Sequence, residues 1–170
     1  KVLEINKQEM VKKLLALDAV KVFEGDIQAT CYDFKDNSIL HDNSLLRLRK
    51  KGDKNFLTFK KVVSSVKAKV VEEIETEVKD FNEMQEILLN MNLKSFKDFT
   101  KKRTSFKIDE TLFEIDEYKE LPVFMEIEAP DIKTIDYYVE KLGVDKTKVK
   151  TWILKKLFEH YNVKNDFARL

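Results

Sequence analysis

Apolar and polar residues alternate along several stretches of the chain, which is the pattern of strands with one buried face. Gly52 and Asp53 lie between two of these stretches and predict the turn of a β-hairpin. The pattern therefore indicates a fold dominated by antiparallel strands. We expect strands over Val20–Glu24, Ile27–Asp33, Leu45–Lys50, Phe56–Lys61, Lys67–Val78, Lys97–Ile108, Leu112–Asp116 and Val123–Ala129.

Four other segments are predicted to be helices, and three of them have start or end signals. Two of them open on capping boxes, and a third begins after a capping aspartate and ends at a glycine. The predicted helices cover residues 7–17, 80–91, 131–142 and 146–161, with these signals at Asn6, Glu9, Asp80, Glu83, Asp131 and Gly143. Strands and helices together predict an α+β fold, with a single domain over residues 1–170.

The polar face of most predicted strands carries charges of one sign. Like charges about 7 Å apart on one face repel by roughly 2 kcal/mol at an effective dielectric near 20. A folded chain that keeps several such pairs needs opposite charges or a ligand beside them. Basic faces carry Arg47, Arg49, Lys60, Lys101 and Arg103, and acidic faces carry Glu73, Glu75, Glu77, Glu114, Asp116, Glu126 and Glu128.

Two interpretations of these faces are open. An antiparallel sheet with one buried and one solvated face explains the alternation without any function. A closed or nearly closed barrel also explains the separation of signs, because acidic and basic strands then face each other across a charged lumen. Since apolar side chains fill most small barrels, an ionic lumen would be a functional feature.

The scarce residue types exclude several kinds of site. Among 170 residues there are three Gly, two His and one Cys, so no glycine-rich phosphate loop, His- or Cys-based zinc site or internal disulfide is expected. The 32 Lys+Arg and 31 Asp+Glu give a net charge of +1, which does not indicate binding to duplex nucleic acid. No apolar run approaches the ~20 residues of a membrane span. With a lone Cys31, these features predict a cytoplasmic protein.

The remaining charged residues suit one kind of ligand. Arginine binds phosphate oxygens through two nitrogens at once, and lysine adds a point charge. Paired carboxylates without His or Cys suit a hard cation, Mg²⁺ or Mn²⁺, which keeps waters and bridges to phosphate. A lumen that holds both groups indicates a site for a triphosphate with a metal ion.

The ordered set of these motifs resembles the CYTH superfamily, the triphosphate tunnel metalloenzymes that include class IV adenylyl cyclases and thiamine triphosphatase. The resemblance covers essentially the whole chain, and it implies an eight-stranded antiparallel β-barrel, or tunnel, with helices outside. The motifs that carry it are LLRLR (45–49), LTFK (57–60), EIETEV (73–78), KKR (101–103), FEID (113–116) and FMEIEAP (124–130).

The resemblance also implies roles for individual residues. The implied triphosphate-binding residues are Lys1, Arg47, Arg49, Lys60, Lys101, Arg103 and, on the last predicted helix, Lys150. The implied metal-binding residues are Glu73, Glu75, Asp116, Glu126 and Glu128, with Glu126, Glu128 and Arg103 as the catalytic set.

The start of the chain departs from the family pattern. Family members carry an ExExK strand whose glutamates bind metal, and the segment KVLEI looks like its end, with Lys1 as the motif's lysine. Both glutamates would then lie upstream of Lys1, or be absent from the protein. Their absence would favour a protein that binds a polyphosphate or nucleotide without turnover.

The expected function is metal-dependent hydrolysis of an inorganic or organic triphosphate such as tripolyphosphate, thiamine triphosphate or ATP. Hydrolysis is favoured because it needs no base-recognition pocket, and the sequence indicates none. The alternatives are a class IV adenylyl cyclase that forms cyclic AMP and pyrophosphate, a non-catalytic binding protein and a purely structural ionic barrel. We expect a monomer or a homodimer without nucleic-acid or membrane partners.

Overall fold

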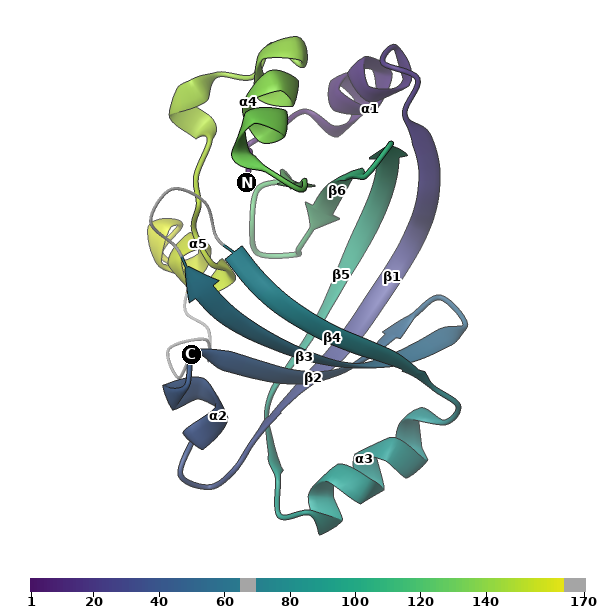
Figure 1. Ribbon diagram of the computed structural model, residues 1–170, viewed down its shortest axis with the longest axis vertical. Coiled ribbons are helices and arrows are strands. Elements are labelled where there is room, and N and C mark those ends of the chain that lie inside the picture. Colours follow the sequence, from purple (N-terminus) through teal and green to yellow (C-terminus); the bar gives the residue numbers. More distant parts are fainter. Residues whose placement is uncertain (65–69, 164–170) are drawn as a thin grey trace. The chain divides into compact units, whose positions relative to one another are not determined.

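The computed structural model describes residues 1–64 and 70–163 (Figure 1). The helices are α1 (Lys7–Leu15), α2 (Ser38–His41), α3 (Phe81–Asn90), α4 (Ile132–Lys141) and α5 (Leu154–His160), with a 3₁₀ turn at Lys146–Lys148. The strands are β1 (Val20–Asp33), β2 (Ser44–Lys51), β3 (Lys54–Ser64), β4 (Val70–Val78), β5 (Lys94–Ile108), β6 (Thr111–Glu117) and β7 (Phe124–Glu128). Residues 67–69, predicted as part of a strand, lie outside the described residues. This content confirms the α+β class.

The strands of the described residues form one seven-stranded sheet with the order β4-β3-β2-β1-β5-β6-β7. The predicted hairpin is present, since β2 and β3 pair antiparallel on either side of Gly52. Val20–Glu24 and Ile27–Asp33, predicted as two strands, are one continuous strand because Gly25 and Asp26 keep extended backbone between them. The eight strands and the closed barrel of the prediction are not confirmed.

The chain divides into two compact units, and β1 and β5 each contribute residues to both. The first unit contains Lys1–Gly25 and the segment that begins at Lys101; the second contains Asp26–Thr100. Each unit has its own buried apolar cluster. Whether the chain acts as a single domain stays a prediction.

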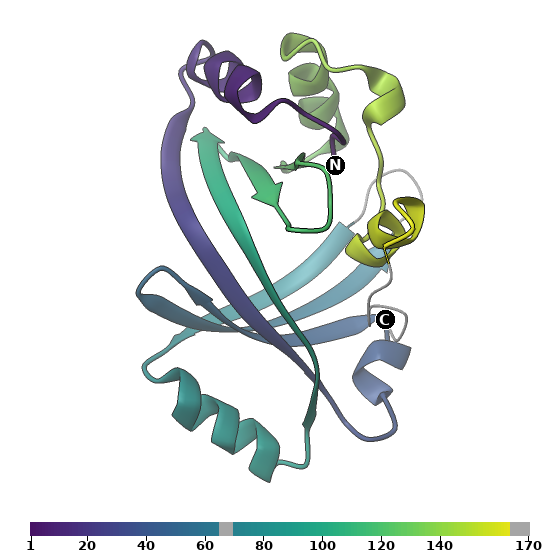
Figure 2. The same ribbon diagram turned by 180° about the vertical axis from the view of Figure 1, so that it is seen from behind.

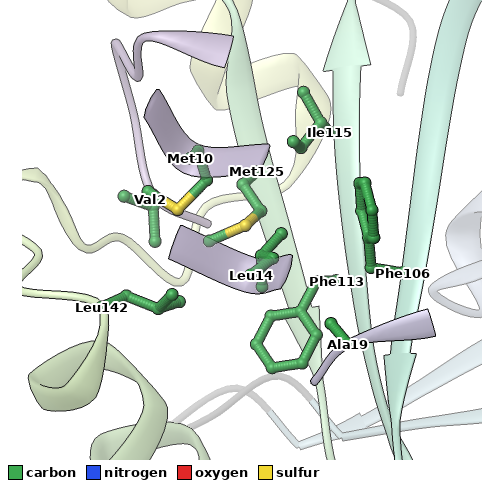
Figure 3. Close-up of a cluster of buried hydrophobic side chains, with 9 residues drawn as sticks. All are labelled: Val2, Met10, Leu14, Ala19, Phe106, Phe113, Ile115, Met125 and Leu142. Carbon is green, nitrogen blue, oxygen red and sulfur yellow. The ribbon is translucent and has the colours of Figure 1, made fainter. Parts of the chain in front are cut away.

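The core of the first unit lies between helices α1 and α4 and strands β5, β6 and β7 (Figure 3). Met10 and Leu14 enter it from α1 because residues four apart share a helix face. In both ribbon views α1 and α4 lie next to each other (Figures 1 and 2), and Lys13 Nζ donates to the Leu142 carbonyl at 2.7 Å. The buried set comprises Val2, Met10, Leu14, Ala19, Phe106, Phe113, Ile115, Met125 and Leu142.

The core of the second unit packs helix α3 against the apolar face of β2. Leu88 of α3 is buried together with Leu48 of β2 and Tyr32 of β1. Helix α3 begins as predicted, because the Asp80 carboxylate accepts hydrogen bonds from the backbone of Asn82 and Glu83. The apolar face of β2 thus contacts a helix in this unit, as the alternation predicts, whereas Ile74 on the apolar face of β4 is 73% exposed.

The end of the chain differs from its prediction. A helix over 146–161 was expected, but only Leu154–His160 is α-helical; Lys146–Lys148 form the 3₁₀ turn, and residues 149–153 are not in a helix. The cause is a long-range pairing: Lys150 N donates to Lys1 O at 2.8 Å, and Lys1 N donates to Lys150 O at 2.7 Å. No described helix has both the length and the apolar character needed to cross a membrane.

Candidate functional site

Seven charged side chains of the first unit gather on one face of strands β5, β6 and β7. The strand register explains this, because Arg103 lies opposite Asp116 and Glu114 lies opposite Glu126. Residues directly opposite each other in an antiparallel pair point to the same face. We call this set the β5–β7 cluster; it comprises Lys1, Lys101, Arg103, Glu114, Asp116, Glu126 and Glu128.

Arg103 is the central cation of the β5–β7 cluster and is only 6% exposed. Its Nε and one terminal nitrogen each donate to Asp116 at 2.6 Å, in the two-pronged geometry that arginine favours. The guanidinium also donates to Glu114 and, at 3.4 Å, to Glu126. These carboxylates hold the pKa of Arg103 well above its usual value although burial opposes the charge. The cation is therefore fixed in place and permanently charged.

Lys101 lies two residues from Arg103 on the same strand face and is 8% exposed. Its Nζ donates to Asp116 at 2.7 Å and lies 5.6 Å from the centre of the Tyr118 ring. Burial and the charge of Arg103 lower the pKa of Lys101 to about 8, against the opposing effect of Asp116. Asp116, implied as a metal ligand, is thus held between the two cations.

Lys1 joins the cluster through the backbone of its neighbour. Val2 forms antiparallel bridges to both Met125 and Val149, so Lys1 lies beside Glu126 on the charged face. The Lys1 amine contacts Glu126 Oε1 in an ion pair. Burial alone would raise the pKa of Glu126, but Lys1, Arg103 and Lys101 together hold it well below its usual value. Glu126 is therefore an anion at neutral pH.

Three carboxylates of the cluster are placed to hold a metal ion. One oxygen from each of Glu114, Glu126 and Glu128 lies within 4.8 Å of the others. Three oxygen donors without nitrogen or sulfur fit a hard cation such as Mg²⁺ or Mn²⁺. Glu126 and Glu128 were predicted as ligands, but Glu114 was not. Its signal was present, since Glu114 shares its strand face with Asp116.

The second unit carries the other predicted site residues on strands β2, β3 and β4. Arg49 donates to both oxygens of Glu75 at 2.9 and 2.7 Å, and Lys60 donates to Glu73 at 2.6 Å. Thr58 also donates to Glu75 at 2.6 Å. Burial works against ionisation of Glu75, yet Thr58, Arg49 and Arg47 lower its pKa. Strand β3 therefore pairs with the acidic strand β4, and Arg49 of β2 reaches Glu75 of β4 across β3.

Arg47 shares the face of Arg49, because the two are separated by one residue of β2. The register places Arg47 opposite Thr58 on one side and Cys31 on the other. We call this set the β2–β4 face; it comprises Arg47, Arg49, Thr58, Lys60, Glu73 and Glu75. Glu73 and Glu75, implied as metal ligands, are paired with Lys60 and Arg49 and are not among the three grouped carboxylates.

Lys150 lies in the extended segment before α5 and not on a helix as predicted. Its backbone pairs with Lys1, and its Nζ lies 5.5 Å from the centre of the Trp152 ring. A separate cleft of about 270 Å³ lies beside α1 and the loop after α4, with Glu9, Lys13 and Val144 among its lining residues. None of the predicted site residues lines this cleft.

Comparison with known proteins points to one family. The CYTH domain model matches residues 2–156. The PH1012 protein from Pyrococcus horikoshii has the same fold, with 20% identity, a TM-score of 0.77 and coverage of 91% of this chain and 95% of that chain. No curated protein sequence matches.

Two further solved structures with this fold are described as putative cyclases. One, from Vibrio parahaemolyticus, has 15% identity and a TM-score of 0.74, covering 92% of this chain and 94% of that chain. The other, from Hippeastrum, is described as having a dominant triphosphatase activity; it has 15% identity and a TM-score of 0.67, covering 93% of this chain and 92% of that chain. At these identities the likeness shows a shared fold.

Proposed function

Because the chain belongs to the CYTH domain family, we propose that it hydrolyses a triphosphate substrate with a bound Mg²⁺ or Mn²⁺. The observation that carries the proposal is the β5–β7 cluster, in which three grouped carboxylates lie on the same face as three cations. A metal ion needs the first set and a polyanion needs the second. A purely structural ionic face needs no such grouping of carboxylates.

Glu114, Glu126 and Glu128 would hold the metal ion, which neutralises phosphate charge and polarises the terminal phosphoryl group when bound. Arg103 and Lys1 now contact two of these carboxylates. Arg103 and Lys1, which lie on the same face as these carboxylates, would supply positive charge to the phosphate oxygens. Asp116 keeps Arg103 in place throughout, because it contacts other nitrogens of the same guanidinium.

The chemical step is the transfer of the terminal phosphoryl group to water. The water oxygen forms a bond to the terminal phosphorus while the bridging P–O bond breaks, and a proton is released to solvent. Charge that develops on the leaving phosphate is stabilised by Lys101 and Arg103, which burial keeps in a fixed arrangement. Arginine in such a position contributes mainly by electrostatic stabilisation.

The β2–β4 face of the second unit carries three further cations that were predicted to bind phosphate. Arg47, Arg49 and Lys60 are proposed to bind phosphate oxygens, as the family resemblance implies. Glu75 and Glu73 hold Arg49 and Lys60 in extended positions, through the bonds described above. In this interpretation these glutamates position cations and do not bind metal.

The reason for preferring hydrolysis to cyclisation is a comparison with a known protein and not the geometry of the site. The Hippeastrum protein of this fold is described as a putative adenylyl cyclase with a dominant triphosphatase activity. A cyclase would use the same charged residues but release pyrophosphate and cyclic AMP from ATP. The two activities can therefore be distinguished by their products.

The test is a product analysis on the full-length protein. Tripolyphosphate, thiamine triphosphate and ATP are each incubated with Mg²⁺ or Mn²⁺, and orthophosphate, pyrophosphate and cyclic AMP are resolved. We expect orthophosphate, and we expect the double variant Glu126→Gln/Glu128→Gln to lose turnover. The matched control is Glu140→Gln, an exposed glutamate of α4. Cyclic AMP from ATP, or unchanged turnover in the double variant, would refute the proposal.

A further inference from the structure

Three aromatic rings meet on the segment that ends with α5, and we call them the aromatic patch: Trp152, His160 and Tyr161. The Trp152 and His160 ring centres are 4.9 Å apart, and so are those of His160 and Tyr161. His160 is exposed, and Trp152 and Tyr161 are partly exposed. Aromatic rings usually bury a large apolar area in a core, so a group of three that is only partly buried needs another explanation.

The core of this region is made by other residues. Leu157 and Phe158 are the buried side chains of α5, and Phe158 packs edge-on against Tyr118 with ring centres 6.0 Å apart. The aromatic patch lies on the part of α5 and its preceding segment that these contacts leave uncovered. It is therefore not needed to fill the interior of the first unit.

The patch is joined to the β5–β7 cluster by backbone pairing. Lys1 and Lys150 exchange two backbone hydrogen bonds and so lie directly opposite each other. Since Lys1 contacts Glu126, Lys150 extends the same charged face by one more chain segment. Trp152 follows Lys150 by two residues, so its ring lies on the chain segment next to this pair. The Lys150 amine over the Trp152 ring agrees with this placement.

From this juxtaposition we propose that Trp152, with Lys150 and His160, forms the subsite for a planar aromatic group carried by an organic triphosphate. The inference rests on the proposed function and adds the class of substrate. A triphosphate bound at the β5–β7 cluster presents its organic end toward Lys150 and Trp152. Lys150 then moves from the indole to a phosphate oxygen, which leaves the indole face for the aromatic group.

The chemistry of the patch selects a flat ring system rather than a sugar or an aliphatic chain. Every nucleobase and the heterocycles of thiamine have a π-face that can stack on indole. Stacking on an aromatic side chain does not depend on base identity, so the subsite distinguishes organic from inorganic triphosphates better than one base from another.

The chain contains a single tryptophan, so its fluorescence reports on this subsite alone. The native protein is titrated with ATP, thiamine triphosphate and tripolyphosphate in the presence of Mg²⁺. Both organic triphosphates are expected to quench the emission in a saturable way, and tripolyphosphate to quench it much less. Equal responses to all three compounds would overturn the proposal. Quenching by only one organic compound identifies which ring system the subsite takes.

A variant tests the same subsite by kinetics. In Trp152→Leu the KM for the organic substrate should rise about 10-fold, while the KM for tripolyphosphate changes less than about 2-fold. The matched control is Tyr137→Leu, an aromatic of α4 that is 54% exposed. An equal rise for organic and inorganic substrates in Trp152→Leu would contradict a stacking role.

The two proposals fail in different ways. If tripolyphosphate is hydrolysed while the organic triphosphates neither quench nor show a selective change in KM, the subsite is wrong and the proposed function stands. If no compound is turned over but the organic triphosphates still quench selectively, the subsite stands and the hydrolysis is wrong.

Discussion

At the scale of single residues, the site depends on how buried charges are compensated. Arg103 is 6% exposed, a position that would be costly for an unpaired charge, and three carboxylates contact it. The same compensation makes Arg103 difficult to replace: lysine keeps the charge but has no planar fork for Asp116. A buried cation with this many partners is a fixed point around which a phosphate chain can be bound.

Cys31 is a residue for which burial excludes a chemical role. Its side chain is 1% exposed, and burial raises the pKa of its thiol to about 12. A raised pKa leaves far less thiolate near pH 8.5 than a free cysteine has. We expect a thiol-specific reagent to label the native protein at least roughly 100-fold more slowly than the urea-unfolded protein.

The measurement is a time course of labelling near pH 8.5. Because Cys31 is the only cysteine, the rate belongs to one residue. Labelling of the native protein at the rate of the unfolded protein would show that the thiol is accessible and reactive. That result would make Cys31 a candidate nucleophile.

At the scale of elements, the pairing of strands explains why one strand face can carry charges of a single sign. Each strand alone has like charges on one face, but β3 pairs with acidic β4 and β5 pairs with acidic β6. Lys60 therefore meets Glu73, and Arg103 meets Asp116, one strand away. Like charges within β3 and β5 are tolerated because opposite charges lie beside them on the neighbouring strand.

Helix α1 is held to the first unit by one face, which gives an element-scale prediction. Leu14 is fully buried, whereas Leu15 is 53% exposed. Leu14→Ala should lower the free energy of unfolding by about 3 kcal/mol, because it removes packed methyl groups and leaves a cavity. Leu15→Ala should change it by less than about 0.5 kcal/mol. Urea titrations followed by circular dichroism give both values, and equal losses would show that the helix face is misassigned.

At the scale of the whole molecule, the metal ion is expected to serve catalysis and not folding. The two apolar clusters contain no predicted metal ligand, and Glu114, Asp116 and Glu126 already have cationic partners in Lys1 and Arg103. Folding therefore does not need a metal to offset the acidic side chains.

Treatment with EDTA should accordingly abolish turnover while it leaves the melting temperature of the substrate-free protein nearly unchanged. Both are measured on the same sample, by product release and by thermal unfolding. Added Mg²⁺ should restore activity in full. A large fall in melting temperature on chelation would assign the metal a structural role instead.

The sequence predicted local elements of the fold better than it predicted long-range pairing. Strand alternation and capping residues such as Asp80 gave most elements close to their observed bounds, because these signals act within a few residues along the chain. The helix predicted over 146–161 was wrong because its first part is drawn into pairing with Lys1, far away in sequence. Helix propensity depends on the local sequence, so it gives no information about a pairing partner that is far away in the chain.

The sequence by itself determined which residues share a strand face and which sign each face carries, because the two-residue repeat of a strand needs no tertiary contact. Only the tertiary structure decided which charged residues lie beside one another. Strand register brought Glu114 beside Glu126, and backbone pairing brought Lys150 opposite Lys1. Register and long-range pairing depend on the packing of the whole unit, so no local pattern in the chain could have fixed them.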